Sequence, residues 1–168
     1  MTRTEVIEKL TNTYEKKNID YGNSAHITFV EFGETALVVR ISDKLSRLVS
    51  LLKNGEAQVN DESLLDTIGD AVTYLVMLVA ELLVEPGDAG KTEEERKASE
   101  KNIDTVFELF DGLDSPMRNP DRPYDISQSR ERLLHIFRTG DATSRRAMYL
   151  SLADRLLEEY VARAKEVK

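Results

Sequence analysis

Apolar residues recur at three- and four-residue steps along most of this chain, most clearly over residues 62–83. This spacing places apolar side chains on one face of an α-helix. The positions concerned are Leu64, Leu65, Ile68, Val72, Leu75, Val79 and Leu82. The same run carries an acidic stripe, because Glu62, Asp66 and Asp70 are four residues apart. The pattern therefore predicts a central amphipathic helix with three carboxylates along its polar face.

The same periodicity predicts five further helices, over residues 4–17, 36–52, 92–110, 128–137 and 143–165. Residues 18–24, NIDYGNS, have the composition of a shaped loop. Residues 26–33, HITFVEFG, are β-branched and aromatic enough for a short strand, and they also fit a loop that leads into the next helix. The sequence leaves these two alternatives open.

Three prolines lie within residues 111–127, which predicts that this segment is the longest irregular loop. The loop separates a four-helix portion in residues 1–110 from two helices in residues 128–168. At 168 residues the chain has the length of one ordinary domain. We therefore expect an all-α single domain, a helical bundle with a four-helix core and two additional C-terminal helices.

Composition narrows the class of protein. Hydrophobic residues at 40% and charged residues at 32% are typical of soluble globular proteins. The net charge of −8 opposes a phosphate backbone, so we expect no direct binding to nucleic acid. Neither a secretory signal nor a membrane span is recognisable, so we expect no membrane association and a cytoplasmic protein, in a cell or an infected cell.

Most familiar catalytic motifs are missing from the sequence. The chain contains no cysteine, which excludes disulfides, thiolate metal sites and cysteine nucleophiles. It also lacks a Gly-x-Ser-x-Gly elbow, a Walker A run and a Rossmann fingerprint. His26 and His135 have no recognisable partner in the sequence. Carboxylates are the functional groups that remain.

Carboxylate oxygens are the ligands that Mg²⁺ prefers, usually together with the phosphates of a substrate. Glu62, Asp66 and Asp70 would supply such ligands. A further carboxylate would come from Asp43 in the preceding helix, or from Glu31 and Glu34 if the chain there turns towards the stripe. Mn²⁺ would substitute for Mg²⁺. A metal ion placed there would activate a water for attack on phosphorus, with a spare carboxylate as general base.

A salt-bridge ladder explains the same spacing without catalysis. Arg40, Lys44 and Arg47 lie on one side of the helix predicted for residues 36–52. An antiparallel packing would bring them against the acidic stripe as ion pairs. Spacing alone favours neither explanation, and cations beside a metal cluster can also hold phosphates.

Three blocks, in order, carry a family resemblance. They are KKNIDYGN at residues 16–23, RISDKLSR at residues 40–47 and ESLLDTIGDAVTY at residues 62–74. With them the chain resembles the nucleotide-modification-associated family found largely in phages. That family is similar to the all-α nucleoside triphosphate pyrophosphohydrolases of the MazG and dimeric dUTPase type.

The resemblance implies an oligomeric helical bundle, a dimer or tetramer, that holds Mg²⁺ between two adjacent helices. It implies cleavage of a (deoxy)nucleoside triphosphate to the monophosphate and pyrophosphate, in control of the nucleotide pool or in phage DNA modification. Asp66 and Asp70 fall where the acidic residues of the third MazG helix lie, and Glu62 is one turn earlier. Asp43 stands in the second helix, where MazG proteins place two glutamates.

In this interpretation the loop residues Asp20, Tyr21 and Asn23 are candidates for contacts to the base, since a tyrosine ring can stack on it. The cations Arg40, Lys44 and Arg47 are the candidates for phosphate contacts. The alternative is a non-catalytic helical nucleotide-binding or scaffolding protein in which the acidic stripe is salt-bridged.

Overall fold

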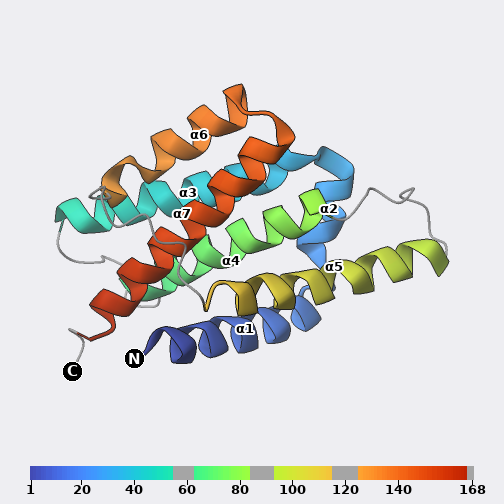
Figure 1. The fold of residues 1–168 in the computed structure, drawn as a ribbon, viewed down its shortest axis with the longest axis horizontal. Coiled ribbons are helices and arrows are strands. Elements are labelled where there is room, and N and C mark those ends of the chain that lie inside the picture. The colour runs from blue at the N-terminus through green and yellow to red at the C-terminus, as the bar shows by residue number, and fades with distance from the viewer. Residues whose placement is uncertain (55–62, 84–92, 115–124, 166–168) are drawn as a thin grey trace.

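The computed structural model describes residues 1–54, 63–83, 93–114 and 125–165, without the side chains of residues 93–101. These residues form helices and no strand (Figure 1), so the all-α prediction is confirmed. In chain order the elements are α1 (Arg3–Asp20), α2 (Ser24–Phe32), α3 (Glu34–Asn54), α4 (Leu64–Leu83), α5 (Glu93–Gly112), the 3₁₀ helix η1 (Ile126–Gln128), α6 (Ser129–Thr139) and α7 (Ala142–Arg163).

The central helix of the fold is α4, the helix with the clearest apolar pattern. More than half of its 20 residues are buried. It packs most extensively against α7 and α3 and also contacts α5, α1 and α2. Gly69 lets two of these neighbours approach, because a Cβ there would lie 2.8 Å from Leu10 Cδ2 and 3.4 Å from Tyr160 Cε2. Figure 1 shows α4 running through the middle of the molecule.

The hydrophobic core is shared by the two ends of the chain. Val6 of α1 and Tyr149, Leu156 and Tyr160 of α7 belong to the same buried cluster as Ile68 of α4. The apolar positions on more than one side of α7 are explained by this packing. The core is therefore not confined to residues 1–110, and α7 is part of it.

Two local predictions around α1 and α2 differ from the structure. Residues 26–33 are neither strand nor loop, since residues 24–32 form α2. Here helical hydrogen bonding overrides the β-propensity of the side chains, and Thr28 Oγ1 donates to the Ser24 carbonyl at 2.6 Å. The loop predicted for residues 18–24 is shorter, because α1 continues to Asp20.

A tight turn at residues 21–23 joins α1 to α2. Gly22 and Asn23 have φ angles of 56° and 57°. This left-handed conformation suits glycine and, among other residues, asparagine best. The sequence Tyr-Gly-Asn therefore fixes a sharp reversal and leaves Tyr21 at its tip. The predicted connector at residues 56–61, the Thr92 cap and most of the proline-rich loop lie outside the described residues.

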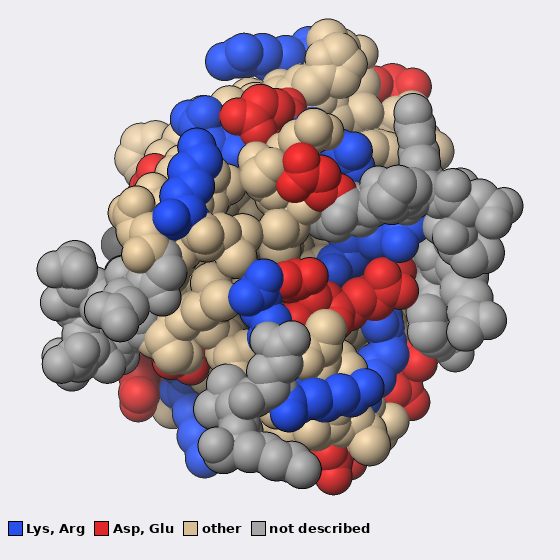
Figure 2. Space-filling model, turned by 90° about the vertical axis from the view of Figure 1, so that its left-hand side faces the viewer, with Lys and Arg blue, Asp and Glu red and all other residues tan. Residues whose placement is uncertain are grey.

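Acidic and basic side chains are interspersed over the face of the molecule in Figure 2. Charges of opposite sign therefore lie near one another on this face, without a continuous basic area. Within the described ranges, no helix combines the length and the apolar character needed to cross a membrane.

A buried ion pair ties the start of α1 to α7. The Arg3 guanidinium hydrogen-bonds to the Asp154 carboxylate, and the Asp154 side chain is only 1% exposed. Arg3 Nε also donates to the Leu113 carbonyl at 2.7 Å, just past the end of α5. One side chain therefore joins three segments that are far apart in the sequence.

We predict that Arg3→Leu lowers the free energy of unfolding by about 3 kcal/mol, because it leaves a buried carboxylate without its partner. The measurement is urea unfolding followed by circular dichroism. Arg3→Leu combined with Asp154→Leu should recover much of the loss, and Lys16→Ala on the exposed side of α1 is the matched control. Equal stability of Arg3→Leu and wild type would contradict the prediction.

Candidate functional site

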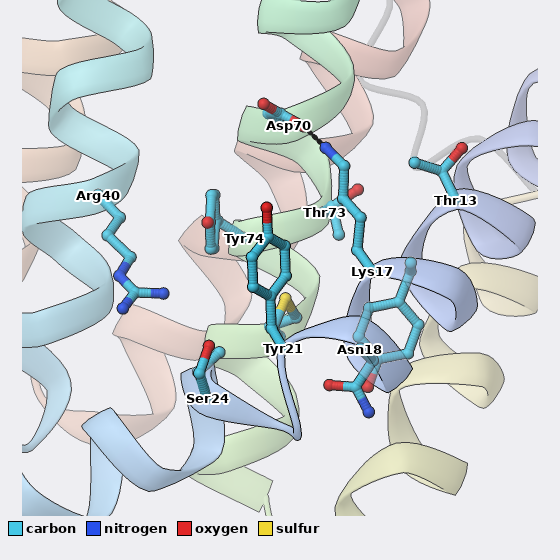
Figure 3. A pocket seen from close by; sticks show the side chains of 12 residues that line it. Thr13, Lys17, Asn18, Tyr21, Ser24, Arg40, Asp70, Thr73 and Tyr74 are labelled. Atoms are coloured by element: carbon cyan, nitrogen blue, oxygen red, sulfur yellow. Dashed lines mark hydrogen bonds and ion pairs between the residues drawn. The ribbon is translucent and has the colours of Figure 1, made fainter.

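A half-open cleft of about 70 Å³ lies where α1, the following turn, α2, α3 and α4 meet. Figure 3 shows the side chains that enter it, with Lys17 and Asn18 from α1, Arg40 from α3, and Asp70, Thr73 and Tyr74 from α4. Tyr21 stands at the opening, with 68% of its surface exposed. The cleft therefore combines aromatic rings, cations and one carboxylate.

The antiparallel register of α3 and α4 divides the cleft into two levels. At one level Lys44 Nζ lies 2.8 Å from Asp70 Oδ2. One helical turn away, the Arg40 guanidinium lies 5.8 Å from the centre of the Tyr74 ring, a cation–π distance. One end of the cleft is therefore ionic and the other is aromatic.

Asp70 is held between two ammonium groups. Lys17 Nζ approaches its Oδ1 at 3.0 Å from α1, opposite Lys44. Burial favours the neutral acid, but the hydrogen bonds and charges of Lys44 and Lys17 outweigh this effect, so the pKa of Asp70 lies below its ordinary value. The carboxylate is therefore ionised at neutral pH. Among the described residues that line the cleft, the cations Lys17 and Arg40 outnumber the carboxylate of Asp70.

The predicted metal ligands do not form a cluster in the described part of the chain. Asp66 is exposed and caps α4, accepting hydrogen bonds from the amide and hydroxyl of Ser63 at 3.1 and 2.7 Å. Asp43 is exposed on α3, and Glu62 lies outside the described residues. Across the described ranges, no three His, Asp or Glu side chains are grouped so that they could hold an ion.

Some predicted nucleotide contacts do meet in the cleft. Tyr21 and Arg40 line it, and Lys44 reaches it through Asp70. Of the predicted salt-bridge ladder, the described residues show this one pair between Lys44 and Asp70. Asp20 is exposed at the end of α1 and does not line the cleft; neither do Asn23, in the turn, and Arg47, in α3.

Sequence analysis did not identify several lining residues of α1 and α4. Lys17 and Asn18 lie in the KKNIDYGN block, where the helix predicted for residues 4–17 meets the loop predicted for residues 18–24. Tyr74 is four residues after Asp70, a helical spacing that places both on one face. This spacing in the sequence could have identified Tyr74 as a neighbour of Asp70 in the site.

A second ionic pair lies beside the cleft. Glu81, in the middle of an apolar run, is buried, and its carboxylate oxygens lie 2.9 and 3.1 Å from His26 Nδ1. The hydrogen bond to Glu81 raises the pKa of His26; burial opposes the shift, and the charge of Glu81 adds to it. The pair joins α2 to α4. In the sequence, an acidic residue inside an apolar run was the feature that could have indicated a buried, paired carboxylate.

Because the pKa of His26 is raised on folding, the charged pair stabilises the protein fully below the unfolded pKa and is lost as pH rises through the folded one. We predict that the stability difference between wild type and His26→Gln is largest below pH 6.5, the ordinary pKa of histidine, and shrinks at alkaline pH. Urea midpoints over a pH series measure it. A difference that does not change with pH would refute the assignment.

Comparison of the chain with protein-family models, curated proteins and solved structures found no match.

Proposed function

We propose that the cleft binds a nucleoside triphosphate, with its phosphates at the ionic level and its base at the aromatic level. The carrying observation is the register of α3 and α4, which places Lys44 beside Asp70 and Arg40 beside Tyr74. A triphosphate is strongly anionic and a nucleobase is planar and aromatic. The ionic level of the cleft therefore suits the triphosphate, and the adjacent aromatic level suits the base.

The ionic level favours a polyanion for an electrostatic reason. Lys17 and Lys44 outnumber Asp70 at this level, and Arg40 adds a third cation one helical turn away. The cleft therefore keeps an excess of positive charge in a protein whose net charge is −8. Lys17 is half exposed, at 53%, so its ammonium can turn from Asp70 towards a phosphate. Lysine and arginine both form charge-assisted hydrogen bonds to phosphate oxygens.

The aromatic level favours a flat ring. The Arg40 guanidinium lies over the Tyr74 ring and is also hydrogen-bonded to Thr28 Oγ1 at 3.4 Å, which holds it between α2 and α3. Tyr21 is exposed at the tip of a tight turn, where its ring can cover a bound base. Stacking on aromatic side chains contributes about 1 to 3 kcal/mol per base.

We predict that Arg40→Ala and Lys17→Ala each weaken binding of a nucleoside triphosphate about tenfold or more. Lys17→Ala removes a charge-assisted hydrogen bond to phosphate, and Arg40→Ala removes the cation that lies over the Tyr74 ring at the level of the base. Isothermal titration calorimetry measures the dissociation constants. Arg138→Ala, on the exposed surface of α6, and Lys16→Ala are the matched controls. Unchanged binding in both cleft variants would refute the proposal.

Hydrolysis of the bound nucleotide to the monophosphate and pyrophosphate is the second candidate. Its support is the resemblance of the block at residues 62–74 together with the ionised Asp70 inside the cleft. Asp43, Glu62 and Asp66 are the other carboxylates that this candidate requires. The described positions of Asp43 and Asp66 favour binding over hydrolysis.

Asp70→Asn separates the two candidates. If the cleft only binds, the variant should bind triphosphate several-fold more tightly, because it loses a negative charge close to the phosphates. Titration calorimetry and a pyrophosphate assay with Mg²⁺ or Mn²⁺ and a panel of dNTPs supply the two measurements. Pyrophosphate release by wild type that disappears in Asp70→Asn would establish hydrolysis and overturn the binding-only function.

A further inference from the structure

We infer that Tyr14 and Asn18 of α1 recognise the base, and that they select bases with a carbonyl oxygen beside a ring N–H over adenine. Uracil, thymine, guanine and hypoxanthine share this group. The inference rests on the proposed function of the cleft and adds the chemical feature by which a nucleotide is chosen.

The hydroxyl of Tyr14 is buried and has no hydrogen-bond partner in the described structure. Tyr14 lines the cleft and is only 3% exposed. Its ring packs against Phe107, with ring centres 5.8 Å apart in an edge-on arrangement, and against Phe110. Buried polar groups are nearly always hydrogen-bonded, so this hydroxyl requires an explanation. A ligand in the cleft supplies the missing acceptor.

The Tyr14 hydroxyl is a donor at neutral pH. Burial and, to a smaller extent, the charge of Glu81 raise the pKa of Tyr14 to about 12. The proton therefore stays on the oxygen, and the hydroxyl can donate to a carbonyl oxygen of the ligand.

Asn18 lies one helical turn after Tyr14, on the same face of α1. Its side chain enters the cleft beside Lys17 (Figure 3). Within the described residues its amide makes no side-chain hydrogen bond. A carboxamide carries one acceptor and one donor group, which match the N–H and the carbonyl oxygen of such a base. The two side chains together present two donors and one acceptor.

The preference for such bases over adenine follows from the carbonyl oxygen that adenine lacks. Adenine has no carbonyl oxygen, so in the same position it would leave the Tyr14 hydroxyl buried and unpaired. A binding site built to hydrogen-bond a ligand discriminates against an analogue that leaves its polar groups unsatisfied.

The test uses dITP and dATP, which carry the same sugar and phosphates. Their purines differ at position 6, oxo against amino, and at the adjacent N1, which carries a hydrogen only in dITP. Wild type should bind dITP about tenfold more tightly, the effect of one buried hydrogen bond. Tyr14→Phe should weaken dITP binding by about the same factor and leave dATP binding unchanged. Asn18→Leu should likewise affect dITP more than dATP. Titration calorimetry measures all of these constants.

Tyr149→Phe is the matched control, because Tyr149 is also buried but its hydroxyl donates to Glu34 Oε1 at 2.6 Å, outside the cleft. It should lower the melting temperature and keep the preference for dITP. Tyr14→Phe should not lower the melting temperature, since its hydroxyl has no partner to lose.

Wild type that binds dITP and dATP equally, or a Tyr14→Phe variant that weakens both equally, would overturn the inference while the nucleotide-binding function stands. Wild type that binds neither nucleotide would overturn both.

Discussion

The structure depends on the burial of α4. This helix is covered by α7 and α3 and touched by α5, α1 and α2, so almost every other helix is positioned by packing on it. Gly69 permits the close approach of α1 and α7, because it has no side chain between Leu10 and Tyr160. Asp70 and Tyr74, on the polar side of α4, are only partly buried and reach the cleft.

Asp70 and Glu81, two acidic residues of α4, are compensated by cationic groups of neighbouring helices. Asp70 of α4 is balanced by Lys44 of α3 and Lys17 of α1, and Glu81 of the same helix is balanced by His26 of α2. Each pair lies partly or fully out of water, where an unpaired charge is costly. The same pairs therefore fix the positions of α1, α2 and α3 around α4 and shape the cleft between them.

Some polar groups of the cleft have hydrogen-bond or ionic partners within the protein, and one buried group has none among the described residues. Asp70 has two cationic partners, and the Arg40 guanidinium is held by Tyr74 and Thr28. The Tyr14 hydroxyl has none among the described residues. Satisfied groups give the site a defined shape before a ligand arrives, and an unsatisfied buried donor gives it a preference among ligands. This division of roles underlies both proposals made for the cleft.

The sequence alone determined the helical class and predicted a central helix over residues 62–83, since apolar spacing along a helix is local information. It offered the pairing of Lys44 with the acidic stripe as one of two alternatives. Only the tertiary structure decided that residues 24–32 form a helix, that α7 shares the core and that Lys17 faces Asp70. These features depend on which faces of distant helices meet, and side-chain spacing within one helix does not contain that information.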